Sequence, residues 1–142
     1  MKQKRQWVLP VAIGAVTLFI WSQSLLPGRI SAEESGFITR LLAGVLGLET
    51  VPAWLHKLVR KAAHFTEFGV LGGLWRGYAT RRGMRFSPLY GLAVAAADEC
   101  LQMLSPDRGP AVTDVAIDYA GYLCGWLLVA GIACFLRHRK EK

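Results

Sequence analysis

The sequence lacks several features that would place it in a common class of soluble protein. It has only three cysteines, Cys100, Cys124 and Cys134, which lie inside apolar stretches without metal-ligand spacing. We therefore expect small buried hydrophobic side chains and no disulfide. No basic groove pattern or stacking motif accompanies the formal net charge of +7, which argues against nucleic acid as a partner. The sequence also has no internal repeats and no low-complexity segments.

Apolar residues are abundant and gather in long runs. They make up 53% of the 142 residues, which indicates an integral membrane protein with one domain, residues 1–142. We predict an all-α fold, a polytopic membrane protein with four transmembrane helices in a bundle plus a short interfacial helix. The predicted spans are residues 7–26, 58–79, 88–104 and 113–136.

The first apolar run and the loop after it need separate interpretation. Lys2, Lys4 and Arg5 precede the run, as in a signal peptide. However, the run is long for a signal sequence and no small-residue cleavage site follows, so we expect an uncleaved helix. In the next loop, apolar residues recur at helical spacing from Phe37 to Leu48. This spacing predicts the short helix in the membrane interface.

Basic residues determine the expected orientation. They precede the first span, follow the second between Arg76 and Arg85, and follow the fourth from Arg137 onward. With four spans, all three groups lie on one side of the membrane. The positive-inside rule then makes both termini cytoplasmic. Nearly all the acidic residues fall in the opposite half, which points to a site on the extracytoplasmic side.

Every predicted span contributes polar side chains to that extracytoplasmic half. Lys61, His64 and Glu67 recur at three-residue intervals, so they share one face of the second helix. The others are Gln23, Asp98, Glu99, Gln102, Arg108, Asp114 and Asp118. Ionisable groups at membrane depth are costly and usually mark function. Four helices can bury them only in their shared interior. We therefore predict one polar pocket facing the outer leaflet.

The residue types in this pocket permit acid/base, ligand-binding and metal chemistry. The candidate catalytic residues are His64, Glu67, Asp98, Glu99 and Asp114. The candidate ligand-binding residues are Gln23, Lys61, Gln102, Arg108 and Asp118, in which the two cations suit a phosphate or carboxylate headgroup. A histidine with several carboxylates can also hold a divalent cation, although no HExxH-type motif is present and no other cofactor is evident. No Ser or Cys stands in a recognisable nucleophile motif.

Structural explanations stay open for individual residues. Lys61 can extend to the headgroups, Asp114 can cap the fourth helix, Arg108 can be a solvated loop charge and His64 can bond between helices. A mutually neutralised structural network would account for the whole set. Apolar packing, however, would hold four helices together without burying so many ionisable groups.

Several separated motifs resemble the VanZ-like family. From about Trp21 to Gly125 they are Trp21-Ser22-Gln23-Ser24, Lys61-x-x-His64-Phe65-x-Glu67-Phe68, Asp98-Glu99-x-x-Gln102, Arg108, and Asp114-Val115-x-x-Asp118-x-x-Gly121-x-x-x-Gly125. Phe68 stands where the family often has Tyr, and Asp118 where it usually has Asn. The resemblance implies a small multi-pass protein of the bacterial cytoplasmic membrane. It also implies a role in low-level resistance to glycopeptide antibiotics, teicoplanin in particular, without a settled biochemical mechanism.

Three functional hypotheses follow from these features. In the first, the pocket binds an anionic lipid-linked or lipid-tailed ligand, either a cell-wall precursor or a lipoglycopeptide, and modulates teicoplanin susceptibility or envelope composition. Membrane lipids would be the other partners. In the second, the protein is a membrane-embedded acid/base or metal-dependent hydrolase or transferase acting on envelope lipid precursors. A proton-coupled carrier ranks last, because the inner halves of the spans are almost purely apolar. The sequence does not decide between binding and catalysis.

Overall fold

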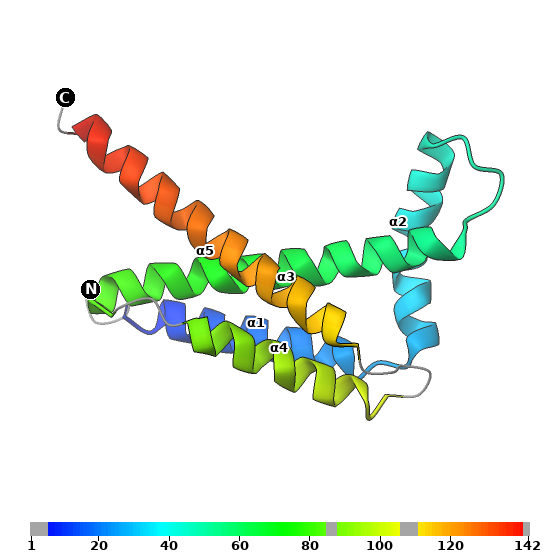
Figure 1. The fold of residues 1–142 in the computed structure, drawn as a ribbon, viewed down its shortest axis with the longest axis horizontal. Helices are drawn as coiled ribbons and strands as arrows, with labels where there is room; N and C mark the ends of the chain where they lie inside the picture. Colours follow the sequence, from blue (N-terminus) through cyan, green and yellow to red (C-terminus); the bar gives the residue numbers. More distant parts are fainter. Residues whose placement is uncertain (1–5, 85–87, 106–110, 141–142) are drawn as a thin grey trace.

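The computed structural model describes residues 6–84, 88–105 and 111–140, apart from the side chains of residues 28–35 and 140. Figure 1 shows α-helices joined by loops in these ranges, and no strand occurs within them. The helices are α1 (Val8–Ser24), α2 (Gly28–Val45), α3 (Ala53–Arg82), α4 (Pro88–Gln102) and α5 (Val112–Lys140). The all-α prediction is therefore confirmed.

Proline and glycine determine several helix boundaries. Pro27 separates α1 from α2, and Pro52 immediately precedes α3. Gly83 ends α3 in the left-handed conformation, with φ of 64°. α2 is longer than the predicted interfacial helix because it begins directly after Pro27 and includes polar residues 28–36, which the apolar spacing does not reveal.

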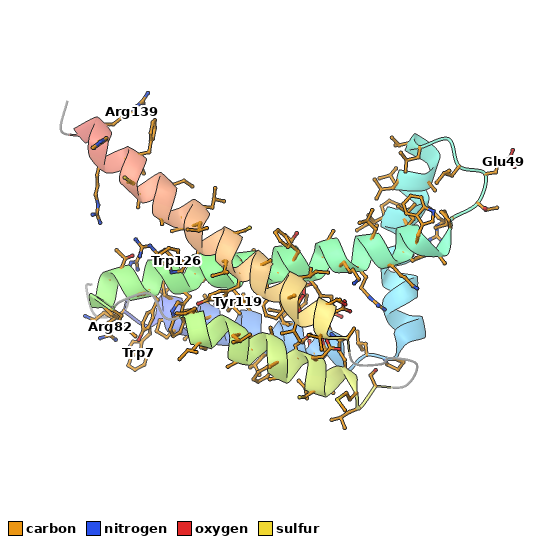
Figure 2. The ribbon with its side chains drawn as sticks, in the orientation of Figure 1. Trp7, Glu49, Arg82, Tyr119, Trp126 and Arg139 are labelled. Atoms are coloured by element: carbon orange, nitrogen blue, oxygen red, sulfur yellow. The ribbon has the colours of Figure 1, made fainter. Side chains whose placement is uncertain are left out.

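The helices α1, α3, α4 and α5 alternate in direction. α1 and α4 run parallel, because their contacts advance together along both chains: Thr17 with Tyr90, Trp21 with Val94, and Ser24 with Asp98. The beginning of α1 lies beside the end of α3, where the side chain of Leu9 approaches Gly77. These two helices are therefore antiparallel. Figure 2 shows the result: Trp7 and Arg82 lie at one end of the molecule and Glu49 at the other.

Glycines bring α3 and α5 into backbone contact. A Cβ atom on Gly125 would overlap the carbonyl oxygen of Gly69, and one on Gly72 would overlap that of Tyr122. Gly73 also lies against α5, so part of the predicted small-residue ridge is the contact surface. Beyond this crossing the C-terminal half of α5, orange to red in Figure 1, extends away from the other helices.

Apolar and aromatic side chains fill the centre of the bundle. The buried core consists of Ile13, Ile20, Phe68, Leu71, Val94, Ala95 and Tyr122. Toward the end at which α3 finishes, the rings of Trp75 and Tyr90 stack with centroids 4.2 Å apart. The guanidinium of Arg76 lies 4.5 Å from the ring centroid of Trp126 in α5, a cation–π contact.

The three cysteines occupy positions that the sequence did not reveal. Cys100, Cys124 and Cys134 are free thiols on exposed helix faces. The prediction that they are buried is wrong. An apolar helix surrounded by apolar neighbours carries no sequence pattern that tells the inward face from the outward one.

Within the described ranges, one helix is long and apolar enough to cross a membrane. The segment is Val112–Arg139 of α5. α1 has 17 residues and α4 has 15, fewer than the roughly 20 that a span ordinarily needs. α3 has 30 residues, but its sequence contains ionisable residues, among them Lys61, His64 and Glu67. The predicted helices are therefore present, whereas their length and composition do not establish four membrane spans.

Candidate functional site: a buried acid and histidine cluster

Asp98 of α4 is the most enclosed ionisable group of the site. Its side chain is 0% exposed, and each carboxylate oxygen accepts a hydrogen bond. Ser24 Oγ, at the end of α1, donates to Oδ1 at 2.6 Å. Gln102 Nε2, one helical turn along α4, donates to Oδ2 at 2.9 Å. These two bonds fix the orientation of the carboxylate.

His64 of α3 lies between two carboxylates from different helices. Its Nδ1 is 3.9 Å from Asp98 Oδ2 and 3.9 Å from Asp118 Oδ1 of α5. One ligand atom from each of the three residues lies within 4.8 Å of the other two. We call His64, Asp98 and Asp118 the trio. Three helices, far apart in sequence, therefore converge on one group of potential ligand atoms.

A small cavity leads from His64 and Asp118 of the trio to partly exposed charges. Its volume is about 10 Å³, and its walls are Arg60, Lys61, His64, Gln102, Asp114, Ile117 and Asp118. Lys61 Nζ donates to Asp114 Oδ1 at 2.7 Å, with 37% and 22% of the two side chains exposed. A volume of about 10 Å³ holds roughly one water molecule or ion. The cavity itself is therefore too small for a lipid headgroup.

Two glutamates adjoin the trio without belonging to it. Glu67 and Glu99 both lie within electrostatic range of Asp118. Glu99 Oε1 accepts a hydrogen bond from the backbone N–H of Ala111, just before α5. That bond satisfies an amide at a helix N-terminus, where a negative charge is favourable. In the described part of the chain, Glu67 Oε2 and Glu99 Oε2 are buried without a hydrogen-bond partner.

Eight of the ten candidate site residues come together here. They are Lys61, His64, Glu67, Asp98, Glu99, Gln102, Asp114 and Asp118. Gln23 is half-buried one residue before Ser24, and Ser24 is the residue that contacts Asp98. Arg108 lies outside the described residues.

Sequence reasoning missed Ser24 and Arg60. Ser24 belongs to the same polar end of the first helix as Gln23, but pattern alone did not separate the two positions. Arg60 directly precedes Lys61 and lines the same cavity. Its position as a basic residue near the start of a predicted span is the sequence feature that could have identified it.

A larger hollow between α3 and α5 has a different character. Its volume is about 730 Å³, and residues such as Phe65, Val70, Leu128 and Val129 line it. Among the residues that the structure describes, no carboxylate, imidazole or basic side chain contributes to its walls. The ionisable chemistry therefore belongs to the trio and its neighbours.

A buried ionisable cluster inside a bundle with apolar outer faces is typical of membrane proteins with a polar interior. The chain belongs to the VanZ/LLP1 family, whose family model matches residues 7–135, nearly its whole length. This family is linked to glycopeptide resistance. Membership in it suggests that the chain is a membrane protein, and the long apolar helix α5 is compatible with that. Comparison with curated proteins and with solved structures finds no match to this chain.

Proposed function

We propose that this protein crosses the bacterial cytoplasmic membrane four times and binds the anionic head of a lipid-linked or lipid-tailed envelope ligand. Binding would take place at the opening of the polar cluster and would modulate glycopeptide susceptibility. One observation carries the proposal: polar side chains from α1, α3, α4 and α5 meet at one end of the bundle, with Arg60 and Lys61 at the opening.

The alternating helix directions support the four-span topology. α1 and α4 point one way, α3 and α5 the other, as four consecutive crossings require. In Figure 2, Trp7, Arg82 and Arg139 lie toward one side of the molecule and Glu49 toward the other. The positive-inside rule assigns the end with the arginines to the cytoplasm. The polar cluster is then on the extracytoplasmic side.

The helix α2 supports the same placement. Its Phe37, Leu41 and Val45 side chains are 70%, 59% and 79% exposed, although all three are apolar. They recur every fourth residue and share one helix face. A helix with such a face would lie in the membrane interface, with Trp54 at the level of the lipid headgroups.

The charges at the opening suit an anionic group that also carries hydrogen-bond donors. Lys61 is paired with Asp114 but remains partly exposed, so a phosphate or carboxylate could share its ammonium group. Arg60, on the same wall, offers a guanidinium for bidentate binding. The carboxylates beneath can accept hydrogen bonds from hydroxyl, amide or ammonium groups. Because the cavity admits only a water-sized group, the head would lie across the opening with its tail along the apolar outer surface.

Teicoplanin susceptibility of a sensitive Gram-positive host tests this function. The strains express wild type, Glu67→Gln or Lys61→Gln, each at matched membrane levels. Glu67→Gln removes a buried carboxylate, and Lys61→Gln removes a cation from the opening. We expect protection by wild type, and loss of protection in both variants because each removes a charge needed for the ligand.

Two exposed residues provide matched controls. Glu49→Gln and Lys57→Gln make the same chemical changes at exposed positions, and Lys57 precedes Lys61 by about one helical turn. Both controls should protect as wild type does. If Glu67→Gln protects as well as wild type does, the buried charges have a structural role instead of a role in ligand binding. Absence of protection by wild type would remove the resistance role and leave ordinary envelope lipids as the ligands to test.

Catalysis is a second candidate, favoured by the position of His64 between two carboxylates. The protein would then hydrolyse or transfer part of an envelope lipid precursor. Metal-dependent turnover of a lipid-linked precursor by the purified protein, abolished in His64→Asn, would support catalysis. Stoichiometric binding of the precursor without turnover would support the binding function instead.

A further inference from the structure

The polar cluster has an excess of negative charge that its described neighbours do not balance. Five carboxylates gather there: Glu67, Asp98, Glu99, Asp114 and Asp118. The basic residues that line the cavity are Arg60 and Lys61, and Lys61 is engaged by Asp114 at the opening. Buried carboxylates need a proton or a cation to offset the cost of desolvation. A bound cation next to the trio would supply that charge.

Asp118 provides an independent indication of a ligand. Asp118 is 2% exposed, and no described residue donates a hydrogen bond to its side chain. Its ionic contact with His64 Nδ1, at 3.9 Å, is longer than a hydrogen bond. Asp118 also lines the cavity of about 10 Å³, so a buried acceptor faces a space large enough for one ion.

We propose that His64, Asp98 and Asp118 bind one divalent cation of the Zn²⁺ or Mn²⁺ type. Three helices supply one ligand atom each, and the separations of 3.9 Å from Nδ1 require only a small inward movement. Metal–ligand bonds of about 2.1 Å place neighbouring ligand atoms roughly 3–3.5 Å apart. Water or the ligand head would complete the coordination from the side of the cavity.

The donor set and its surroundings determine the class of metal. An imidazole nitrogen suits Zn²⁺ and two carboxylates suit Mn²⁺, whereas the harder Mg²⁺ and Ca²⁺ prefer oxygen ligands throughout. Ser24 and Gln102 hold the Asp98 carboxylate by one hydrogen bond to each oxygen. Partners of this kind orient metal ligands in known sites. Metal binding at this site requires no lipid or antibiotic, so it can be tested independently of the proposed function.

Metal binding to the full-length protein in detergent tests the site directly. The protein is stripped with chelator and titrated with Mn²⁺ alone, followed by electron paramagnetic resonance, and Zn²⁺ is then used as competitor. We expect one saturable Mn²⁺ site per chain that Zn²⁺ displaces. Asp118→Asn should weaken binding at least about tenfold, since loss of a metal ligand costs more than loss of a side chain that hydrogen-bonds to a ligand.

Glu49→Gln is the control. It removes one carboxylate at an exposed position in the loop after α2, outside the cavity, and should change the affinity by no more than about threefold because distant charges are screened. His64→Asn is the second test variant, and circular dichroism and gel filtration verify that each variant is folded. Absence of a saturable site in wild type, equal weakening by Glu49→Gln and Asp118→Asn, or displacement by Mg²⁺ as effective as by Zn²⁺ would each overturn the proposal.

Discussion

Single residues hold the buried carboxylate of Asp98 in place. Asp98 is fully buried, and its two oxygens accept hydrogen bonds from Ser24 and Gln102. A buried charge that loses one partner incurs a desolvation cost which no solvent molecule readily offsets. The hydroxyl of Ser24 therefore has more influence on stability than a serine at the end of a helix usually has.

At this residue scale we predict that Ser24→Ala destabilises the protein. Loss of a hydrogen bond to a charged group should lower the free energy of unfolding by about 1.5–3 kcal/mol. Denaturation of the purified protein in detergent, followed by circular dichroism, measures the change. Ser22→Ala is the control, because Ser22 is exposed and its hydroxyl donates to Phe19 O of its own helix. Its effect should stay within about 0.5 kcal/mol. Equal effects of the two variants would contradict the role of Ser24.

At the scale of elements, the crossing of α3 and α5 positions two members of the trio. His64 and Asp118 both precede the glycine contacts on their helices, so the separation of the two backbones determines how close these side chains come. Where Gly69 and Gly125 meet, the backbones touch without intervening side chains. Close approach of this kind depends on small residues.

We predict that Gly125→Ala loosens this crossing although alanine favours helices. The added Cβ would overlap the carbonyl oxygen of Gly69, so the backbones must separate. Overpacking should cost about 1–3 kcal/mol in the free energy of unfolding. Gly131→Ala, on the same helix, is the control, since no atom lies within 4 Å of its Cβ position. Thermal denaturation in detergent should show a lower midpoint for the first variant and an unchanged or higher one for the second. Similar midpoints would contradict close packing at Gly125.

At the scale of the whole molecule, the number of membrane crossings decides which side the polar cluster faces. By length and composition α5 alone qualifies among the described helices, whereas the alternating directions favour four crossings. The two arrangements place the end of α3 differently. With four crossings, the loop after α2 and the end of α3 lie on opposite sides. With α5 alone, they lie on the same side.

Single cysteines distinguish these two topologies. Glu49→Cys and Met84→Cys are introduced separately after the three native cysteines are replaced by alanine, and both positions are exposed. A membrane-impermeant maleimide applied to intact cells should label Glu49→Cys. Met84→Cys should react only after permeabilisation. Labelling of both from outside, or of neither, would contradict the four-span topology.

Three features of the sequence are local: the apolar runs, the prolines and glycines at helix ends, and the ionisable residues inside apolar segments. The sequence alone therefore predicted the helices and most members of the site. Tertiary structure decided which polar groups meet. Ser24 instead of Gln23 reaches Asp98, Asp118 faces His64, and Lys61 pairs with Asp114. Successive helix residues are rotated by about 100°, so a shift of one position changes the face on which a side chain lies. That rotation is fixed by contacts between distant segments, above all the glycine contacts of α3 and α5. For the same reason the outward position of the three cysteines could not be predicted from an apolar pattern that surrounds them on every side.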